Sequence, residues 1–295
     1  MKCKDNSPKS HHFVPESYLK RFADPSGFLH IYDRTANQWR KAKPKEVMHI
    51  RYYYRQEWAP PGVDQNIAEI VLGEWLDNLA KNAIDDLMFT PWELAEEKFA
   101  TLLQYLEFQR IRVPRQAEAA MMLMRQTILR LAPPDIAVEV DAGKFQLSMN
   151  KSARFDYMRM MVGQFLPWFG RMEWEIIEAE KGSAFIATDS PLSFYNAACL
   201  PPAEAGIAFA GTIVLFPLSP RYLLTMRHPE YRKNRDICRL EVIPDPILRD
   251  RTVPISRGRV WNKETVANHN KVMGLLSDRL VVGESKEVLE QCLTS

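Results

Sequence analysis

The sequence predicts an α+β fold, because segments with helical and strand periods occur in separate runs. An N-terminal hairpin is expected within 1–60, a central helical bundle over 64–168, an antiparallel sheet of hairpins over 171–261 and C-terminal helices over 262–295. A βαβ fold alternates strands with helices, and this order does not. The length suits one large domain or two modest ones, and we expect a single α+β domain over 1–295.

The N-terminal region combines a short helix with strands. Tyr18 and Phe22 have the spacing of one or two helical turns. The apolar segment 28–32 is followed by a turn at 35–38, which predicts a β-hairpin that returns at Trp39. The tyrosine-rich segment 51–55 predicts a further strand.

The central region predicts helices. One follows Asp64, a capping residue, and another begins at the capping box of Thr90-Pro91-Trp92-Glu93 and continues to about Arg112. Further helices are expected over 115–131 and 151–166. The methionines of 115–131 are expected to pack in the core, because Met fills irregular apolar gaps.

The period changes after Gly170. Residues 173–178 and 184–187 flank the turn Lys181-Gly182-Ser183, which predicts a hairpin. The other expected elements are a strand pair at 212–216 and 222–225, a helix over 263–281 and a short terminal helix over 285–293.

Composition excludes several classes of protein. No run of about eighteen uncharged apolar residues occurs, and the first residues lack the apolar core of a secretory signal. We therefore expect no membrane span and a cytoplasmic location. The four cysteines lie far apart in the sequence, which favours neither a disulfide framework nor a structural zinc site.

Basic residues concentrate in two stretches. Residues 1–60 contain twelve Lys and Arg against six Asp and Glu, and residues 221–263 contain eleven against five. The intervening residues 61–180 are acidic, with twelve against nineteen. If the two basic stretches meet, they form a positive surface for nucleic acid; otherwise they are solvated faces.

Motifs for common enzyme classes are absent. The sequence contains no G-x-x-x-x-G-K-[ST], no G-x-G-x-x-G, no H-E-x-x-H and no G-x-S-x-G. Protein kinases, dinucleotide oxidoreductases, zincin proteases and standard α/β-hydrolases are therefore disfavoured.

Four polar residues are candidates for chemistry, each with a structural alternative. His12 is a general base or metal ligand, or it orders the N-terminal segment. Arg112 grips phosphate, or it complements a helix dipole. Asp189 ends an apolar strand and either holds a metal or moves a proton, or it caps a turn. Asn270 lies on a late helix as a site residue or as a buried hydrogen-bond anchor.

The motifs resemble those of a known family. His12-Phe13-Val14-Pro15 followed by Tyr18-Leu19-Lys20, Arg112-Val113-Pro114, Thr188-Asp189-Ser190-Pro191 and Phe216-Pro217-Leu218-Ser219-Pro220 occur in the order seen in the bacterial domain-of-unknown-function family 4238. The resemblance spans about residues 11–283. Thr188 replaces the serine associated with that position and keeps a hydroxyl group. The family supplies no activity to transfer.

The residues suggest two classes of function. If His12, Arg112, Asp189 and Asn270 converge, they suit phosphodiester cleavage assisted by a divalent metal such as Mg²⁺, with Asp189 and His12 as its ligands. This predicts a nuclease or toxin-like effector, in phage defence. The alternative is a non-catalytic module that binds nucleic acid, with the tyrosines of 52–54 stacking on bases, or that binds a protein through the acidic helices.

Overall fold

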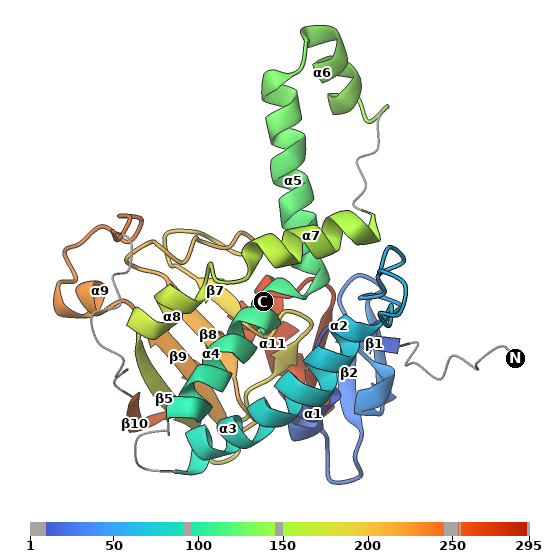
Figure 1. The fold of residues 1–295 in the computed structure, drawn as a ribbon. Coiled ribbons are helices and arrows are strands. Elements are labelled where there is room, and N and C mark those ends of the chain that lie inside the picture. Colours follow the sequence, from blue (N-terminus) through green and yellow to red (C-terminus); the bar gives the residue numbers. More distant parts are fainter. Residues whose placement is uncertain (1–9, 91–95, 145–149, 245–252, 254, 294–295) are drawn as a thin grey trace, which may run out of the picture.

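The computed structural model describes residues 10–90, 96–144, 150–244, 253 and 255–293, and it confirms the α+β class. Its larger sheet has the strand order β10–β5–β9–β8–β7 (Figure 1). These strands are β5 (Glu173–Ala179), β7 (Ser193–Tyr195), β8 (Ile213–Pro217), β9 (Tyr222–Arg227) and β10 (Ile255–Trp261). Neighbouring strands are antiparallel except β10, which runs parallel to β5.

A second sheet joins the two ends of the chain. Its strand order is β3–β2–β11–β6. Its strands are β2 (Leu29–Asp33), β3 (Gln38–Ala42), β6 (Ala187–Thr188) and β11 (Leu280–Gly283). The predicted hairpin of β2 and β3 is confirmed, and β11 extends it by pairing with β2. A separate ladder joins β1 (Ser10–His12) to β4 (His49–Arg51).

Helices surround both sheets. They are α1 (Glu16–Leu19), η1 (Lys20–Phe22), η2 (Pro44–Glu46), α2 (Ile67–Ile70), η3 (Val71–Asp77), α3 (Asn78–Phe89), α4 (Glu96–Ile111), α5 (Pro114–Leu131), α6 (Pro134–Asp141), α7 (Lys151–Met161), α8 (Leu166–Arg171), α9 (Pro229–Lys233), α10 (Lys263–Leu276) and α11 (Lys286–Leu293). Helix α4 packs on the larger sheet, where Phe99 meets Trp174 with ring centroids 5.1 Å apart. None of the described helices combines the length and apolar character that a membrane crossing requires.

The N-terminal motif is anchored in the main core. Tyr18 is buried and stacks on Phe216, with ring centroids 5.3 Å apart. Its hydroxyl donates a hydrogen bond to the carbonyl of Pro217 at 2.7 Å. Two of the sequence motifs, distant along the chain, therefore pack against each other.

Alternation along β5 gives the larger sheet two different faces. Trp174 and Ile176 are buried in the main core, whereas Glu173 and Glu175 point to the opposite face. Further along that opposite face, Ile177 packs with Leu223 and Val266 of α10. Helix α10 thus covers one end of this face.

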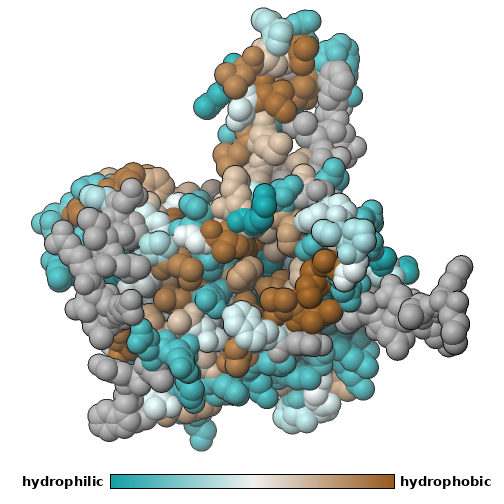
Figure 2. Space-filling view, viewed as in Figure 1, coloured by the Kyte–Doolittle hydropathy of each residue, from teal (hydrophilic) through white to brown (hydrophobic). Residues whose placement is uncertain are grey.

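Helices α5 and α6 project from the body of the protein (Figure 1). Apolar residues gather on this projection (Figure 2). Its exposed large apolar side chains are Met122, Leu123, Met124, Leu131, Ile136 and Val138. The expectation that the methionines of 115–131 lie in the core is therefore wrong for Met122 and Met124, because this part of α5 extends beyond the body.

Two strand predictions are corrected. A strand is expected over 51–55, but β4 ends at Arg51 and residues 52–54 form a turn, where Tyr52 has a positive φ of 54°. Residues 173–178 and 184–187 do not form a hairpin. Strand β5 pairs with β9 and β10, while the chain after the turn enters the other sheet, where β6 pairs with β11.

One predicted helix is shorter in the structure, and the start of another lies partly outside the described residues. The helix expected over 263–281 ends at Leu276, and β11 begins at Leu280, because Leu280–Gly283 pairs with β2. The capping box expected at Thr90–Glu93 extends into residues 91–95, which lie outside the described residues. The expected strand pair after Thr212 is confirmed as β8 and β9.

Candidate anion-binding site

His12 lies at the end of β1, where its ring is 5.4 Å from that of His49 between centroids. The ring donates a hydrogen bond to the backbone of Lys45, and its Nε2 is buried with no hydrogen-bond partner among the described residues. Burial lowers the pKa of His12, and His49 lowers it further. The imidazole is therefore neutral near pH 7.

Arg112 is fully buried at the end of α4. Its guanidinium forms a bidentate pair with Asp77, with N–O distances of 3.2 and 3.1 Å. It also donates to Oε1 of Gln109 at 2.6 Å, and Gln109 in turn donates to the carbonyl of Phe13. The guanidinium of Arg112 is therefore paired with a carboxylate of the same protein. Through Gln109, the Arg112 motif is also linked by hydrogen bonds to Phe13 of the His12 motif.

Asp189 and Asn270 hold the two ends of the β6 segment. The buried carboxylate of Asp189 accepts backbone N–H bonds from Asp278, Arg279 and Leu280 at 2.7–3.0 Å. Burial raises its pKa to about 6, although these donors oppose the shift. The amide of Asn270 accepts from the N–H of Ile186 at 3.2 Å and donates to the carbonyl of Ala184 at 2.8 Å.

The four predicted site residues form two groups. His12 lies near enough to Arg112 for the two to interact electrostatically, and Asp189 and Asn270 bracket β6. No hydrogen bond or ion pair joins one group to the other among these four described residues. Within the described part of the chain, no group of three or more His, Cys, Asp and Glu is arranged to hold a metal.

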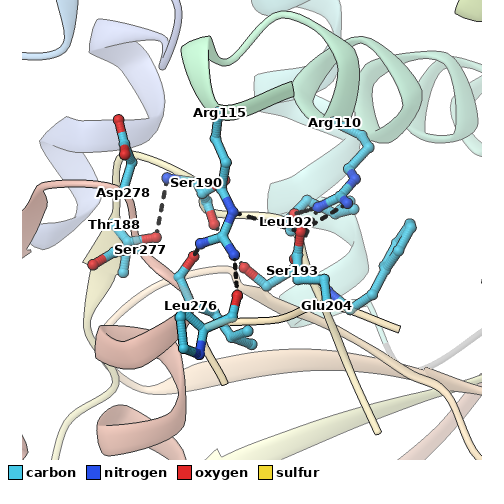
Figure 3. Close-up of polar contacts among 12 residues, drawn as sticks. Arg110, Arg115, Thr188, Ser190, Leu192, Ser193, Glu204, Leu276, Ser277 and Asp278 are labelled. Carbon is cyan, nitrogen blue, oxygen red and sulfur yellow. Dashed lines mark hydrogen bonds and ion pairs between the residues drawn. The ribbon is translucent and has the colours of Figure 1, made fainter. Parts of the chain in front are cut away.

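Two further arginines lie beside Arg112 at the corner between α4 and α5. Figure 3 shows Arg110 and Arg115 pointing toward Glu204 and the segment around Ser190. Arg110 pairs with Glu204 at 3.0 and 2.9 Å, and Arg115 donates to the carbonyl of Leu276. Every arginine of this corner, defined as residues 110–115, therefore has partners within the protein.

A different arrangement of arginines lines a cavity of about 530 Å³ on the open part of the larger sheet. The described lining is Glu173, Glu175, Tyr195, Ala197, Gly211, Ile213, Arg227, Tyr231, Arg232, Arg235, Arg239 and Arg259, which we call the arginine cavity. The sheet register places Arg227 opposite both Glu173 and Ile213, and Ile213 opposite Tyr195. This row of side chains therefore shares one face of the sheet.

Positive charge exceeds negative charge in this lining, with five arginines against two glutamates. Arg232 contacts Glu173 at 2.8 Å, and Arg259 contacts Glu175 at 3.4 Å. The Nε of Arg227 is buried with no hydrogen-bond partner among the described residues. Burial lowers the pKa of Arg227, and the neighbouring arginines lower it further against the opposing effect of Glu175.

A close backbone approach holds Arg239 at the cavity. Its carbonyl accepts hydrogen bonds from the N–H of Gly211 and the side chain of Asn196, both at 2.9 Å. A Cβ at position 211 would lie only 2.6 Å from the Cβ of Arg239. Glycine is therefore needed at position 211 to bring this arginine against the sheet. The Nε of Arg239 donates to the hydroxyl of Tyr231 at 2.8 Å.

A comparison with family models identifies the chain. The model described as "Protein of unknown function (DUF4238)" matches residues 10–287. The chain belongs to the DUF4238 family. This confirms the resemblance seen in the motifs. Searches of curated proteins and of solved structures gave no match.

In this DUF4238 chain, no sequence motif singles out the individual arginines of the cavity. The available signal was the basic stretch 221–263, which contains all five of them. Net charge alone does not distinguish a lined cavity from a solvated face. In Figure 1, β1 and β2 lie on the opposite side of the molecule from α9, so these described parts of the two basic stretches do not form one surface. The cavity arginines therefore come from the stretch 221–263 and not from residues 1–60.

Proposed function

We propose that this DUF4238 protein binds nucleic acid through its phosphate groups, with the arginine cavity as the contact site. The observation that carries the proposal is the excess of arginines around Arg227, whose buried Nε has no hydrogen-bond partner among the described residues. A guanidinium presents paired N–H donors that match two phosphate oxygens. An anion in the cavity would relieve the repulsion among these cations.

Aromatic groups in the cavity support a nucleotide ligand over a simple inorganic anion. Tyr195 and Tyr231 both line it. Aromatic faces stack on bases of any sequence, and arginines contact the phosphates beside them. The tyrosines of 52–54 are less suited to this role, because Tyr53 and Tyr54 are buried in the core.

The test is binding of fluorescently labelled single-stranded RNA and DNA, followed by anisotropy at several salt concentrations. The variant Arg235→Ala removes an exposed cavity cation. The matched control Arg40→Ala removes an exposed cation from β3, in the other basic stretch. We expect Arg235→Ala to weaken binding by about tenfold and to reduce the salt slope by roughly 1, as expected for loss of one phosphate contact.

Arg40→Ala should change the affinity less than about twofold, because long-range effects of exposed charges are screened by salt. Equal losses in the two variants would show that the attraction is a property of net charge and not of the cavity. Affinity that is unchanged in Arg235→Ala would reject the cavity as the contact site.

Cleavage is measured in the same samples with Mg²⁺, with Mn²⁺ and with chelator. The nuclease or effector role predicted from His12, Arg112, Asp189 and Asn270 requires products that disappear in Asp189→Ala. Binding without products under all three conditions favours the non-catalytic module. A cleavage assay is needed to separate these two functions, because Asp189 and Arg112 already have partners within the protein and could serve only the fold.

A further inference from the structure

The net positive charge of the arginine cavity suits a ligand that carries more than one negative charge. Its two glutamates contact Arg232 and Arg259. Arg227, Arg235 and Arg239 have no ion pair with a carboxylate among the described residues. An internal phosphodiester of a strand carries one negative charge, whereas a terminal phosphomonoester carries about two at neutral pH. Three cations that form no ion pair with a described carboxylate therefore match a terminal phosphate better than a link in the backbone.

The size of the cavity also favours one nucleotide unit over a continuous strand. A volume of about 530 Å³ falls within the usual range for a site that encloses a single small ligand. The strands of the sheet form one wall of the cavity, where Arg227 and Ile213 lie in register. The segment around Arg239 packs against the sheet and forms a second wall.

We infer that the arginine cavity binds the terminal phosphate of a nucleotide, with Arg227 and Arg235 on the phosphate and Tyr195 or Tyr231 on the base. This inference rests on the proposed function and specifies its ligand. The same chemistry is available from two sources, the phosphorylated end of a nucleic-acid strand and a free nucleoside monophosphate. The experiment separates these sources.

The experiment compares one single-stranded RNA sequence with three kinds of ends: a 5′-phosphate, a 3′-phosphate and hydroxyls at both ends. Internal labelling leaves the ends free. Adenosine monophosphate and adenosine serve as unlabelled competitors. We expect one of the phosphate-ended strands to bind about tenfold or more tightly than the hydroxyl-ended strand, as charge-assisted contacts to arginine would give.

The variant Arg235→Ala should remove this preference, and its matched control is Lys233→Ala. Arg235 is exposed and lines the cavity, whereas Lys233 is an exposed cation at the end of α9 outside the described lining. Because Arg235 forms no described ion pair, its removal is not expected to unfold the protein. Retention of the preference in Lys233→Ala, with loss in Arg235→Ala, supports the inference.

Other outcomes separate the inference from the proposed function. Equal affinity for phosphate-ended and hydroxyl-ended strands, with both reduced in Arg235→Ala, overturns the inference and leaves nucleic-acid binding in place. Binding of adenosine monophosphate, but not adenosine, without binding of any strand supports the terminal-phosphate site and rejects nucleic acid as its source. Binding of none of these ligands overturns both proposals.

Discussion

Two groups of arginines in this protein show opposite arrangements. In the corner formed by residues 110–115, Arg112 is fully buried and pairs with Asp77, and Arg110 pairs with Glu204. In the arginine cavity, Arg227 is buried in part and forms no ion pair with a carboxylate among the described residues. Internal pairing indicates that a cation serves the fold, whereas an excess of cations over the carboxylates beside them indicates a ligand from outside. The predictions below test this difference, beginning with the largest effect.

The largest effect is expected from Asp77→Asn, which leaves the buried guanidinium of Arg112 without its carboxylate. Removing one partner of a buried ion pair destabilises proteins by about 3–5 kcal/mol. Urea unfolding measures the loss. The control Glu290→Gln breaks an exposed i,i+4 pair with Lys286 and should cost less than about 0.5 kcal/mol. A loss below about 1 kcal/mol in Asp77→Asn would show that Arg112 is not held in this way.

Asn270→Ala should have the next largest effect, a loss of about 2 kcal/mol, because it leaves the N–H of Ile186 and the carbonyl of Ala184 buried without their partner. The matched control is Asn268→Ala, which changes an exposed amide on the same helix. Thermal unfolding compares the two variants. If Asn270→Ala has normal stability but loses nucleic-acid binding or cleavage, Asn270 belongs to a functional site and not to the support of β6.

These arrangements differ in how well the sequence predicts them. The hairpin of β2 and β3 and the pair of β8 and β9 follow from local alternation and turn residues, and both are found. The destination of residues 184–187 does not follow, because the turn at Gly182 is the same whether the next strand pairs with β5 or enters the other sheet. Long-range pairing with β11 decides it.

The candidate site was harder to predict for the same reason. Polar residues in motifs stand out in a sequence, and Asp189 and Asn270 proved to have backbone partners far along the chain. The cavity instead combines Glu173 of β5, Arg227 of β9 and a loop arginine, Arg239. Their proximity depends on strand register and on the close approach at Gly211, and neither is visible in local patterns.

The variant Glu69→Gln tests whether a carboxyl group near Arg112 is destabilised by burial. We expect a moderate change in the melting temperature that depends on pH. Burial raises the pKa of Glu69 to about 7, although Arg112 and the backbone N–H of His12 oppose this shift. A carboxyl with a raised pKa contributes stability below its unfolded pKa of about 4.5, and this contribution is lost as the pH rises through 7. Glu69→Gln should therefore melt about 2–4 °C higher than the natural protein at pH 8, a gain of roughly 1 kcal/mol. The two proteins should melt closer together at pH 4.5, and a gain that is independent of pH would contradict the shift.

The smallest effect on stability is expected from Arg227→Met, and the same substitution at Arg112 provides the contrast. Methionine keeps the apolar part of the arginine side chain and removes a cation that lies near Arg232, Arg235 and Arg259. Without ligand, the free energy of unfolding should change by less than about 0.5 kcal/mol, because relief of this repulsion offsets the lost contacts. Arg112→Met should instead lose several kcal/mol of stability, since it leaves Asp77 buried without its partner.

Adding a nucleotide ligand should raise the melting temperature of the natural protein and leave that of Arg227→Met unchanged. A loss of several kcal/mol in ligand-free Arg227→Met would place Arg227 with the arginines that support the fold, and the two groups would then no longer differ in function.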